Sequence, residues 1–491
     1  MKVFLLLAVC LTSLALPSPG ADKITIVLSD KAPPLEKIAA QSLKTELKLL
    51  FAIEVSVNDL APADSSFSIL IGSPQTNPAI EASEWPKLSD QGHILKSTQK
   101  GLIVGGATPV ATLWAAGELS YHFGLRHLLR GDARPIEKPA LKFTNINTLY
   151  EPTTRVRAWS GFSDHPHGQS SWPLEQQKLL FAQLVKLKFT HLVLPSAPPT
   201  FSPIPVDGDT AGRSAFKGAR FFSSPVASGF SESIANAAVD SGLIVVSTPP
   251  PNTLQIPLGS PTASVLPEFS ASRLEADFRT IKASHSQGFT AIAVMPGDLN
   301  AAAHFLSRAA YDASLTTKQA FEQLITPICG DGVSERLWLG FEHVASAAQL
   351  IGENDPSLGI PMDKMWLRHL ASKSAPSEWI TKVKNHYAEA VSEMYRGNTR
   401  SRDGARPFIL YHAKRMEFAL HYLTAIEALL TASYAASQNK ADASAEATDA
   451  AVEGIYNALS AQADAARDPS DLAAIALLNQ LAYRPLLKSI H

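Results

Sequence analysis

The sequence predicts an α/β protein with an added all-α part: a small N-terminal α/β domain, an incomplete TIM-like (β/α) barrel and a C-terminal helical domain. Three observations predict this fold class. Strand and helix patterns alternate over residues 22–130, continuous apolar strands separated by helices fill residues 154–312, and strand patterns vanish over residues 313–491. Residues 131–153 are expected to form a linker and an entry strand.

The first domain is expected to be compact rather than doubly wound. Its alternation offers too few crossovers for half of a Rossmann fold, and residues 101–107 lack the glycine spacing of a phosphate-binding loop. The expected elements are strands at 24–28 and 68–72, helices at 34–50 and 110–123, and a hairpin formed by strands 93–96 and 102–106.

The middle region is expected to hold a parallel sheet, because its strands are continuously apolar and helices separate them. A complete (β/α)₈ barrel usually takes about 250 residues, so the short span with few strands predicts an incomplete one. The expected strands are 155–159, 191–194, 243–247 and 290–294, and the expected helices are 174–187, 231–241 and 271–284.

Two Pro-, Ser- and Gly-rich stretches, 195–229 and 247–268, are expected to be long loops after strand ends. Barrel active sites lie at those ends. An incomplete barrel also exposes sheet edges that another element must cover. The helical domain or a second copy of the chain would cover them, so a homo-oligomer is one expected assembly.

The N-terminus has the pattern of a signal peptide over residues 1–20. Lys2 precedes an apolar run at 3–16, which small residues at 17–21 interrupt. We therefore expect a secreted or periplasmic protein with no membrane segment after cleavage. The net charge of −2 gives no reason to expect nucleic acid as a partner. Cys329 is the one cysteine after this leader, so we expect no internal disulfide and a buried thiol.

Residues 105–119, Gly-Gly-Ala-Thr-Pro-Val-Ala-Thr-Leu-Trp-Ala-Ala-Gly-Glu-Leu, lead into a Phe-Gly-Leu-Arg corner at 123–126. This stretch resembles the end of an accessory domain that precedes the catalytic barrel in several glycoside hydrolases: the family 67 α-glucuronidases, the family 20 hexosaminidases and the family 89 α-N-acetylglucosaminidases. The domain order is similar too. The resemblance implies a barrel-degenerate relative with a carbohydrate partner and no cofactor. Family 20 enzymes carry an adjacent Asp-Glu pair, which residues 154–312 lack, so no catalytic residue is carried over.

Hydrolysis of a glycoside normally needs two carboxylates, and two candidates follow expected barrel strands. Asp298 follows the strand at 290–294, which is the position of a barrel catalyst. Alternatively, it caps the helix that begins just after it. Asp164 lies in the loop after the first barrel strand, and Glu268 is a weaker choice for a second acid.

The loop that carries Asp164 also carries His165 and His167, which would bind substrate or transfer a proton. Alternatively, the loop is polar surface. A His-x-His pair with one aspartate does not define a metal site, because no third or fourth ligand is indicated. We therefore expect no metal.

Trp159 and Trp172 flank this loop and are expected to stack on sugar rings or, alternatively, to pack in a domain seam. Arg157 is expected to point into the barrel mouth and bind a carboxylate, or to form a structural ion pair. In the helical domain, one expected helix carries Tyr411, Lys414, Arg415 and Glu417, and Arg415 and Glu417 are expected to make interdomain salt links.

Secretion, the resemblance and a strand-end acid favour a secreted carbohydrate-active protein of glycoside hydrolase type, acting on an oligo- or polysaccharide. The alternative is a non-catalytic carbohydrate-binding or structural protein that keeps a degenerate glycosidase scaffold. Its basis is the short barrel and the lack of an evident carboxylate pair.

Overall fold

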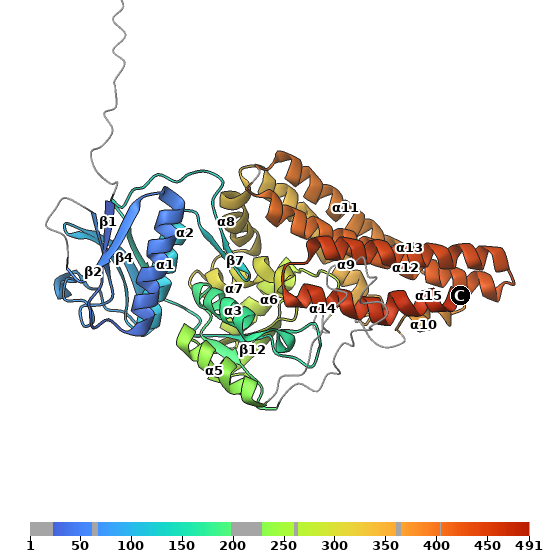
Figure 1. The fold of residues 1–491 in the computed structure, drawn as a ribbon, viewed down its shortest axis with the longest axis horizontal. Coiled ribbons are helices and arrows are strands. Elements are labelled where there is room, and N and C mark those ends of the chain that lie inside the picture. Colours follow the sequence, from blue (N-terminus) through green and yellow to red (C-terminus); the bar gives the residue numbers. More distant parts are fainter. Residues whose placement is uncertain are drawn as a thin grey trace, which may run out of the picture.

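A computed structural model describes residues 23–60, 67–197, 228–259, 264–359, 365–402 and 404–490. The expected signal peptide lies outside these residues, as does nearly all of the stretch 195–229. Figure 1 shows three regions in chain order: an N-terminal α/β part, a central sheet with its helices, and a helical C-terminal half. No helix among the described residues is long and apolar enough to cross a membrane.

The N-terminal part is a six-stranded sheet with two helices on the face toward the rest of the molecule (Figure 1). Its elements are β1 (Lys23–Val27), α1 (Pro34–Phe51), β2 (Glu54–Asn58), β3 (Phe67–Ile71), β4 (His93–Thr98), β5 (Gly101–Gly106), α2 (Pro109–His122) and β8 (Asn147–Tyr150). The strand order is β2-β1-β3-β5-β4-β8. The strands β2, β1, β3 and β5 run parallel, whereas β4 is antiparallel to β5 and β8.

The expected strands, helices and hairpin of this part are confirmed, and β2 and β8 are additions. Both are edge strands with two exposed residues each, so their apolar patterns are weak. β8 comes from the segment expected to form a linker and an entry strand, which also forms β7 (Gly131–Ala133), the partner of β6 (Arg126–Leu128).

The central part is a sheet of five parallel strands flanked by helices. Its elements are β9 (Val156–Ser160), α3 (Leu174–Lys186), β10 (His191–Val193), α5 (Ser228–Ser241), β11 (Ile244–Val246), β12 (Thr253–Pro257), α6 (Ala271–Ala283), β13 (Gly288–Ile292) and α7 (Asn300–Ala309). The order is β11-β10-β9-β13-β12, so the last strand lies beside the first, as in a closed barrel. This order matches the first three and last two strands of an eight-stranded barrel.

The expected fold class is confirmed, and the central sheet is open rather than closed into a barrel. One strand was not expected: β12 lies inside the stretch 247–268 predicted to be a loop. It is an edge strand that ends in Pro257, and prolines are tolerated at that position of a sheet. Its proline-rich surroundings concealed it.

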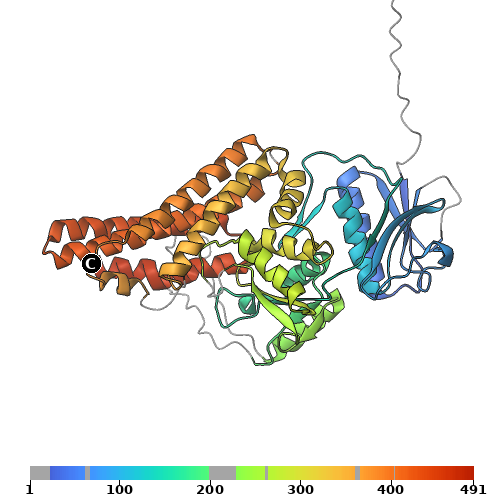
Figure 2. The ribbon, with the colours of Figure 1, turned by 180° about the vertical axis from the view of Figure 1, so that it is seen from behind.

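The C-terminal half is helical, as expected. Its elements are α8 (Thr317–Cys329), α9 (Val333–Asn354), α10 (Met365–Leu370), α11 (Glu378–Arg400), α12 (Arg406–Ser437), α13 (Ala441–Ala465), α14 (Pro469–Leu478) and α15 (Arg484–Ile490). The long helices α12 and α13 form a pair that extends away from the sheets (Figure 2). Cys329 is buried as expected, and burial raises the pKa of its thiol to about 12.

A buried ion cluster joins the N-terminal part to the amino-terminal ends of the central strands. Glu118 of α2 pairs with Lys188, which precedes β10, and with Arg308 of α7 at 2.5 Å. Burial alone would raise the pKa of Glu118, but the two cations hold it well below its usual range. Burial lowers the pKa of Lys188 to about 7 against the opposing effect of Glu118.

Candidate functional site

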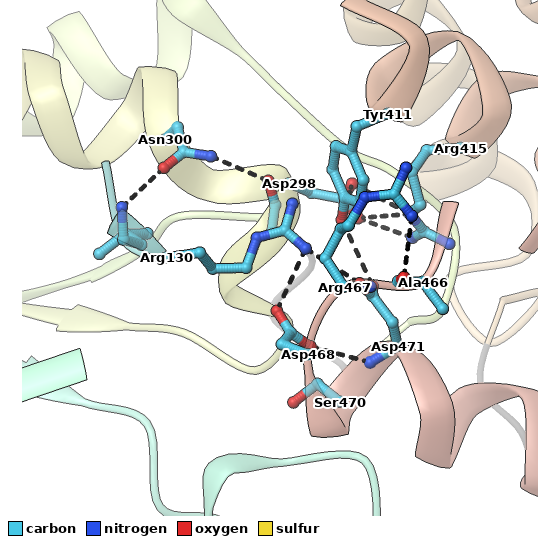
Figure 3. Close-up of polar contacts among 12 residues, drawn as sticks. Arg130, Asp298, Asn300, Tyr411, Arg415, Ala466, Arg467, Asp468, Ser470 and Asp471 are labelled. Carbon is cyan, nitrogen blue, oxygen red and sulfur yellow. Dashed lines mark hydrogen bonds and ion pairs between the residues drawn. The ribbon is translucent and has the colours of Figure 1, made fainter. Parts of the chain in front are cut away.

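Asp298 lies just beyond the carboxyl end of β13, in a 3-10 turn (Pro296–Leu299). Arg415 of α12 holds its carboxylate: Nε lies 3.0 Å from both oxygens and Nη2 lies 2.6 Å from Oδ2. Figure 3 shows this pair within a polar cluster. Asp298 is 9% exposed and Arg415 0%. The expected interdomain link of Arg415 is confirmed. The alternative role of Asp298 as a helix cap is wrong, because its side chain makes no cap bond to the turn or to α7.

The first turn of α14 closes this cluster from the other side (Figure 3). Asp468 caps α14 by accepting a hydrogen bond from the backbone N–H of Asp471 at 3.0 Å. Arg130 Nη1 lies 3.1 Å from Asp471 Oδ2 and 3.5 Å from Asp468 Oδ2. The Tyr411 hydroxyl donates to Asp298 Oδ1 at 3.3 Å and lies at the same distance from Asp471 Oδ1. The cluster therefore holds three carboxylates and two guanidinium groups in a buried space.

Gly297 makes this close packing possible. A Cβ atom at this position would lie 2.1 Å from the Tyr411 hydroxyl and 3.0 Å from Cζ of Arg130. Asn300 then links the same turn to the N-terminal part: its Oδ1 accepts from the backbone N–H of Leu129 at 2.8 Å, and its amide donates to the carbonyl of Gly297 at 3.1 Å. Three regions of the chain thus meet at one strand end.

Protein atoms bury both tryptophans that were expected to stack on sugars. The indole N–H of Trp172 donates to Ser470 Oγ of α14 at 2.8 Å, and that of Trp159 donates to Gln169 Oε1 at 3.0 Å. Their exposed fractions are 3% and 0%. Neither ring offers a face to a ligand, so the expectation of sugar stacking is corrected to packing.

Little space remains next to Asp298. The cavity there has a volume of about 20 Å³, and Glu268 also lines it. This is room for about one water molecule, whereas small-molecule sites typically measure about 300–1,000 Å³. Among the residues that the structure describes, the position that would host a barrel catalyst therefore holds an arginine-bound carboxylate beside a space too small for a sugar.

The loop after β9 carries the other candidate residues. Asp164 is exposed, His165 is half-buried and His167 is buried. The two imidazole rings lie 5.6 Å apart, and burial lowers the pKa of His165. Within the described ranges, no group of three His, Cys, Asp or Glu side chains could hold a metal ion. The loop remains a candidate for ligand contact through its outer residues.

Arg157 lies at the opposite end of the sheet from the position expected. Its Nε donates to the carbonyl of Lys188 at 2.6 Å, and its Nη1 donates to the carbonyl of Thr154 at 2.7 Å and to Gln91 Oε1 at 2.8 Å. These partners precede the central strands or belong to the N-terminal part. The expectation that Arg157 points into the barrel mouth is therefore wrong, and its role is to join two regions.

Asp468 gives the cluster at α14 a dependence on pH. Burial and the neighbouring Asp471 raise the pKa of Asp468, while Arg130 acts against them. Folded Asp468 therefore keeps its proton at pH values where the unfolded residue has lost it, so this group reduces stability as pH rises from the usual aspartate range toward neutrality.

We expect Asp468→Asn to remove this contribution, because the amide oxygen still caps α14 but cannot ionise. The measurement is the midpoint of thermal unfolding at pH 5 and pH 8. The midpoint of the native protein should fall more between these values than that of the variant, while Asp449→Asn, at an exposed site on α13, should follow the native protein. Equal falls in all three proteins would contradict the expectation.

Comparison with known proteins shows a shared fold. No protein-family model matches the sequence, and no curated protein matches it. Among solved structures, the chain is similar to a family GH115 4-O-methyl-α-glucuronidase with specificity for decorated arabinogalactans. The TM-score is 0.56 at 11% identity, covering 92% of this chain and 79% of that one. A GH138 enzyme targeting pectin rhamnogalacturonan II matches at a TM-score of 0.49 and 9% identity, over 90% of this chain and 92% of that one.

The chain therefore has a glycoside hydrolase-like fold. The particular families expected from the resemblance, 20, 67 and 89, are not supported. Sequence reasoning identified Asp298 and Arg415 but missed Arg130, Asp468 and Asp471. An available signal was Asp468 followed by Pro469, which is typical of a helix start. It predicts where α14 begins, but not that α14 begins against the ends of the central strands.

Proposed function

We propose that this chain is a non-catalytic carbohydrate-binding protein built on an incomplete glycoside hydrolase scaffold. One observation carries the proposal: the strand-end acid Asp298 is bound by Arg415 and enclosed by the start of α14. A catalytic carboxylate must reach the glycosidic bond. Asp298 faces a space of about 20 Å³, which is too small for that contact.

The carbohydrate part of the proposal rests on the fold. The similar GH115 protein is described as acting on decorated arabinogalactans, and a scaffold can keep ligand binding after its catalytic groups have been lost. The expected signal peptide at residues 1–20 supports a place outside the cytoplasm, secreted or periplasmic, where polysaccharides are accessible.

Hydrolysis is the second candidate function. Glu268 and Asp298 line the same small cavity, so a second carboxylate is available beside the first. Asp164 is a further acid, exposed on the loop after β9. If the protein is a hydrolase, α14 must withdraw from the strand ends before a sugar can enter, and Arg415 must release Asp298.

The two candidates are separated by assaying binding and hydrolysis on the same glycans. We expect the protein to be retarded in native gels that contain soluble plant or algal polysaccharides, while releasing no reducing ends from them and no aryl group from aryl glycosides. Asp298→Asn and Asp164→Asn should bind as the native protein does. Turnover that Asp164→Asn abolishes, or that Asp298→Asn abolishes while its circular dichroism spectrum stays that of the native protein, would establish the hydrolase. Absence of both binding and turnover would refute a carbohydrate-active role.

A further inference from the structure

The structure contains a groove large enough for a sugar at some distance from the closed strand end. It has a volume of about 680 Å³, within the range of about 300–1,000 Å³ for small-molecule sites. One wall is the start of α6 with Glu268 and Ser270 before it, and the other is α9 (Figure 1). The first wall follows β12, so it belongs to the carboxyl-terminal side of the central sheet, where barrel folds bind their ligands.

A single stripe of α9 forms the second wall. Trp338, Glu342, Ala345, Gln349 and Gly352 recur at helical spacing and all line the groove. At 1.5 Å per residue, the stripe is about 21 Å long. That length suits an extended chain of sugars better than a compact metabolite.

The polar groups of the groove suit a ligand rich in hydroxyls. Glu342 is exposed, and its Oε1 accepts a hydrogen bond from the indole N–H of Trp338 at 2.8 Å. Gln349 lies exposed two turns further along α9, and Ser270 and Ser272 line the facing wall. Amides and hydroxyls donate hydrogen bonds to sugar hydroxyls and accept them, and carboxylates accept them. Trp338, 8% exposed, supplies an apolar wall between them.

The charges of the groove select against acidic sugars. Its charged lining residues are Glu268, Glu342 and Arg273. Arg273 Nη2 donates to the backbone carbonyls of Pro257 at 2.9 Å and Gly259 at 2.8 Å, so this guanidinium already serves the β12–α6 connection. One negative charge remains in excess, and like charges across a binding site reduce affinity.

We infer that the groove between α6 and α9 is the carbohydrate-binding site of this protein and that it takes a neutral oligosaccharide. The inference rests on the proposed carbohydrate-binding function and adds to it a location and a class of ligand. The ligand would lie along α9, beside the sheet rather than over its centre, so binding does not require α14 to move.

The inference is tested by calorimetric titration of the full chain with neutral xylo-, gluco-, manno- and galacto-oligosaccharides and with an acidic oligogalacturonide. We expect a neutral sugar to bind. Glu342→Gln and Gln349→Ala should each weaken it about tenfold, the effect of losing roughly one hydrogen bond to a charged or well-placed group. Ala345→Trp, which fills the groove from α9, should abolish binding. Glu335→Gln, exposed on the same helix outside the groove, is the matched control and should bind normally.

The possible outcomes separate this inference from the proposed function. Neutral sugar binding that is unchanged in Ala345→Trp overturns the groove but leaves the proposed function standing. If no sugar binds, both are overturned. Preference for the acidic oligosaccharide overturns the class of ligand. Binding of a lysine-rich peptide in place of sugar, weakening as salt is added, would identify an acidic protein-binding groove instead.

Discussion

Replacing Arg415 by methionine is expected to lower the free energy of unfolding by about 3–5 kcal/mol, the usual loss when one partner of a buried ion pair is removed. Arg415 is fully buried, and its guanidinium makes three contacts of 3.0 Å or less with Asp298. It also donates to Gln462 and to the carbonyl of Val265. Methionine fills similar space but leaves the carboxylate of Asp298 without its counter-ion. Urea unfolding followed by circular dichroism measures the loss.

The double variant Arg415→Met with Asp298→Asn is the control for this prediction. Removing both charges should recover much of the stability, because the cost arises from an uncompensated buried charge rather than from lost packing. Additive losses in the double variant would show that the two residues do not depend on each other, which would contradict the description of the closed strand end.

Glu118→Gln, at the other end of the central sheet, is expected to lower the free energy of unfolding by a similar amount, about 3–5 kcal/mol. The glutamate pairs with both Lys188 and Arg308 at the junction with the N-terminal part. Without it, the pKa of Lys188 should fall below its present value of about 7, and the lysine would lose its proton at neutral pH. The midpoint of thermal unfolding measures the effect.

The pH dependence of this variant follows from the same cluster. Because folding lowers the pKa of Lys188, the unfolded chain binds more protons than the folded one between about 7 and 10.5, and stability rises with pH over that window. In Glu118→Gln the rise should begin at a lower pH. Glu175→Gln, in an exposed pair with Lys178, should change neither the midpoint nor its pH dependence. An unaltered midpoint in Glu118→Gln would contradict the role assigned to the cluster.

Much of the fold could be predicted from the sequence because its elements have strong local patterns. α11 and α9 show long helical periodicity, and β13 is a mostly apolar run, so their type and position follow from residues close in sequence. β2, β8 and β12 could not be predicted in this way. Each is a short edge strand, and edge strands depend on pairing with residues far along the chain.

The candidate site could be predicted less completely from the sequence, because it too depends on contacts between residues far apart in the chain. Asp298 could be identified from its place after a strand, but its partner Arg415 lies 117 positions away, and their pairing depends on how the helical half docks. Arg157 was assigned to the wrong end of its strand, because alternation tells which face a side chain takes but not toward which end a long one extends. The groove on α9 consists of ordinary surface residues and carries no motif.

Saturation-transfer NMR of a bound oligosaccharide, followed over a day by its anomeric proton signals, tests the central claim most directly. One sample then reports both contact with the protein and cleavage of the sugar. We predict saturation transfer to a neutral oligosaccharide with unchanged anomeric signals, because Asp298 is bound by Arg415 and the space beside it is about 20 Å³. New reducing-end signals that appear with the native protein, and are absent with Asp298→Asn, would contradict it.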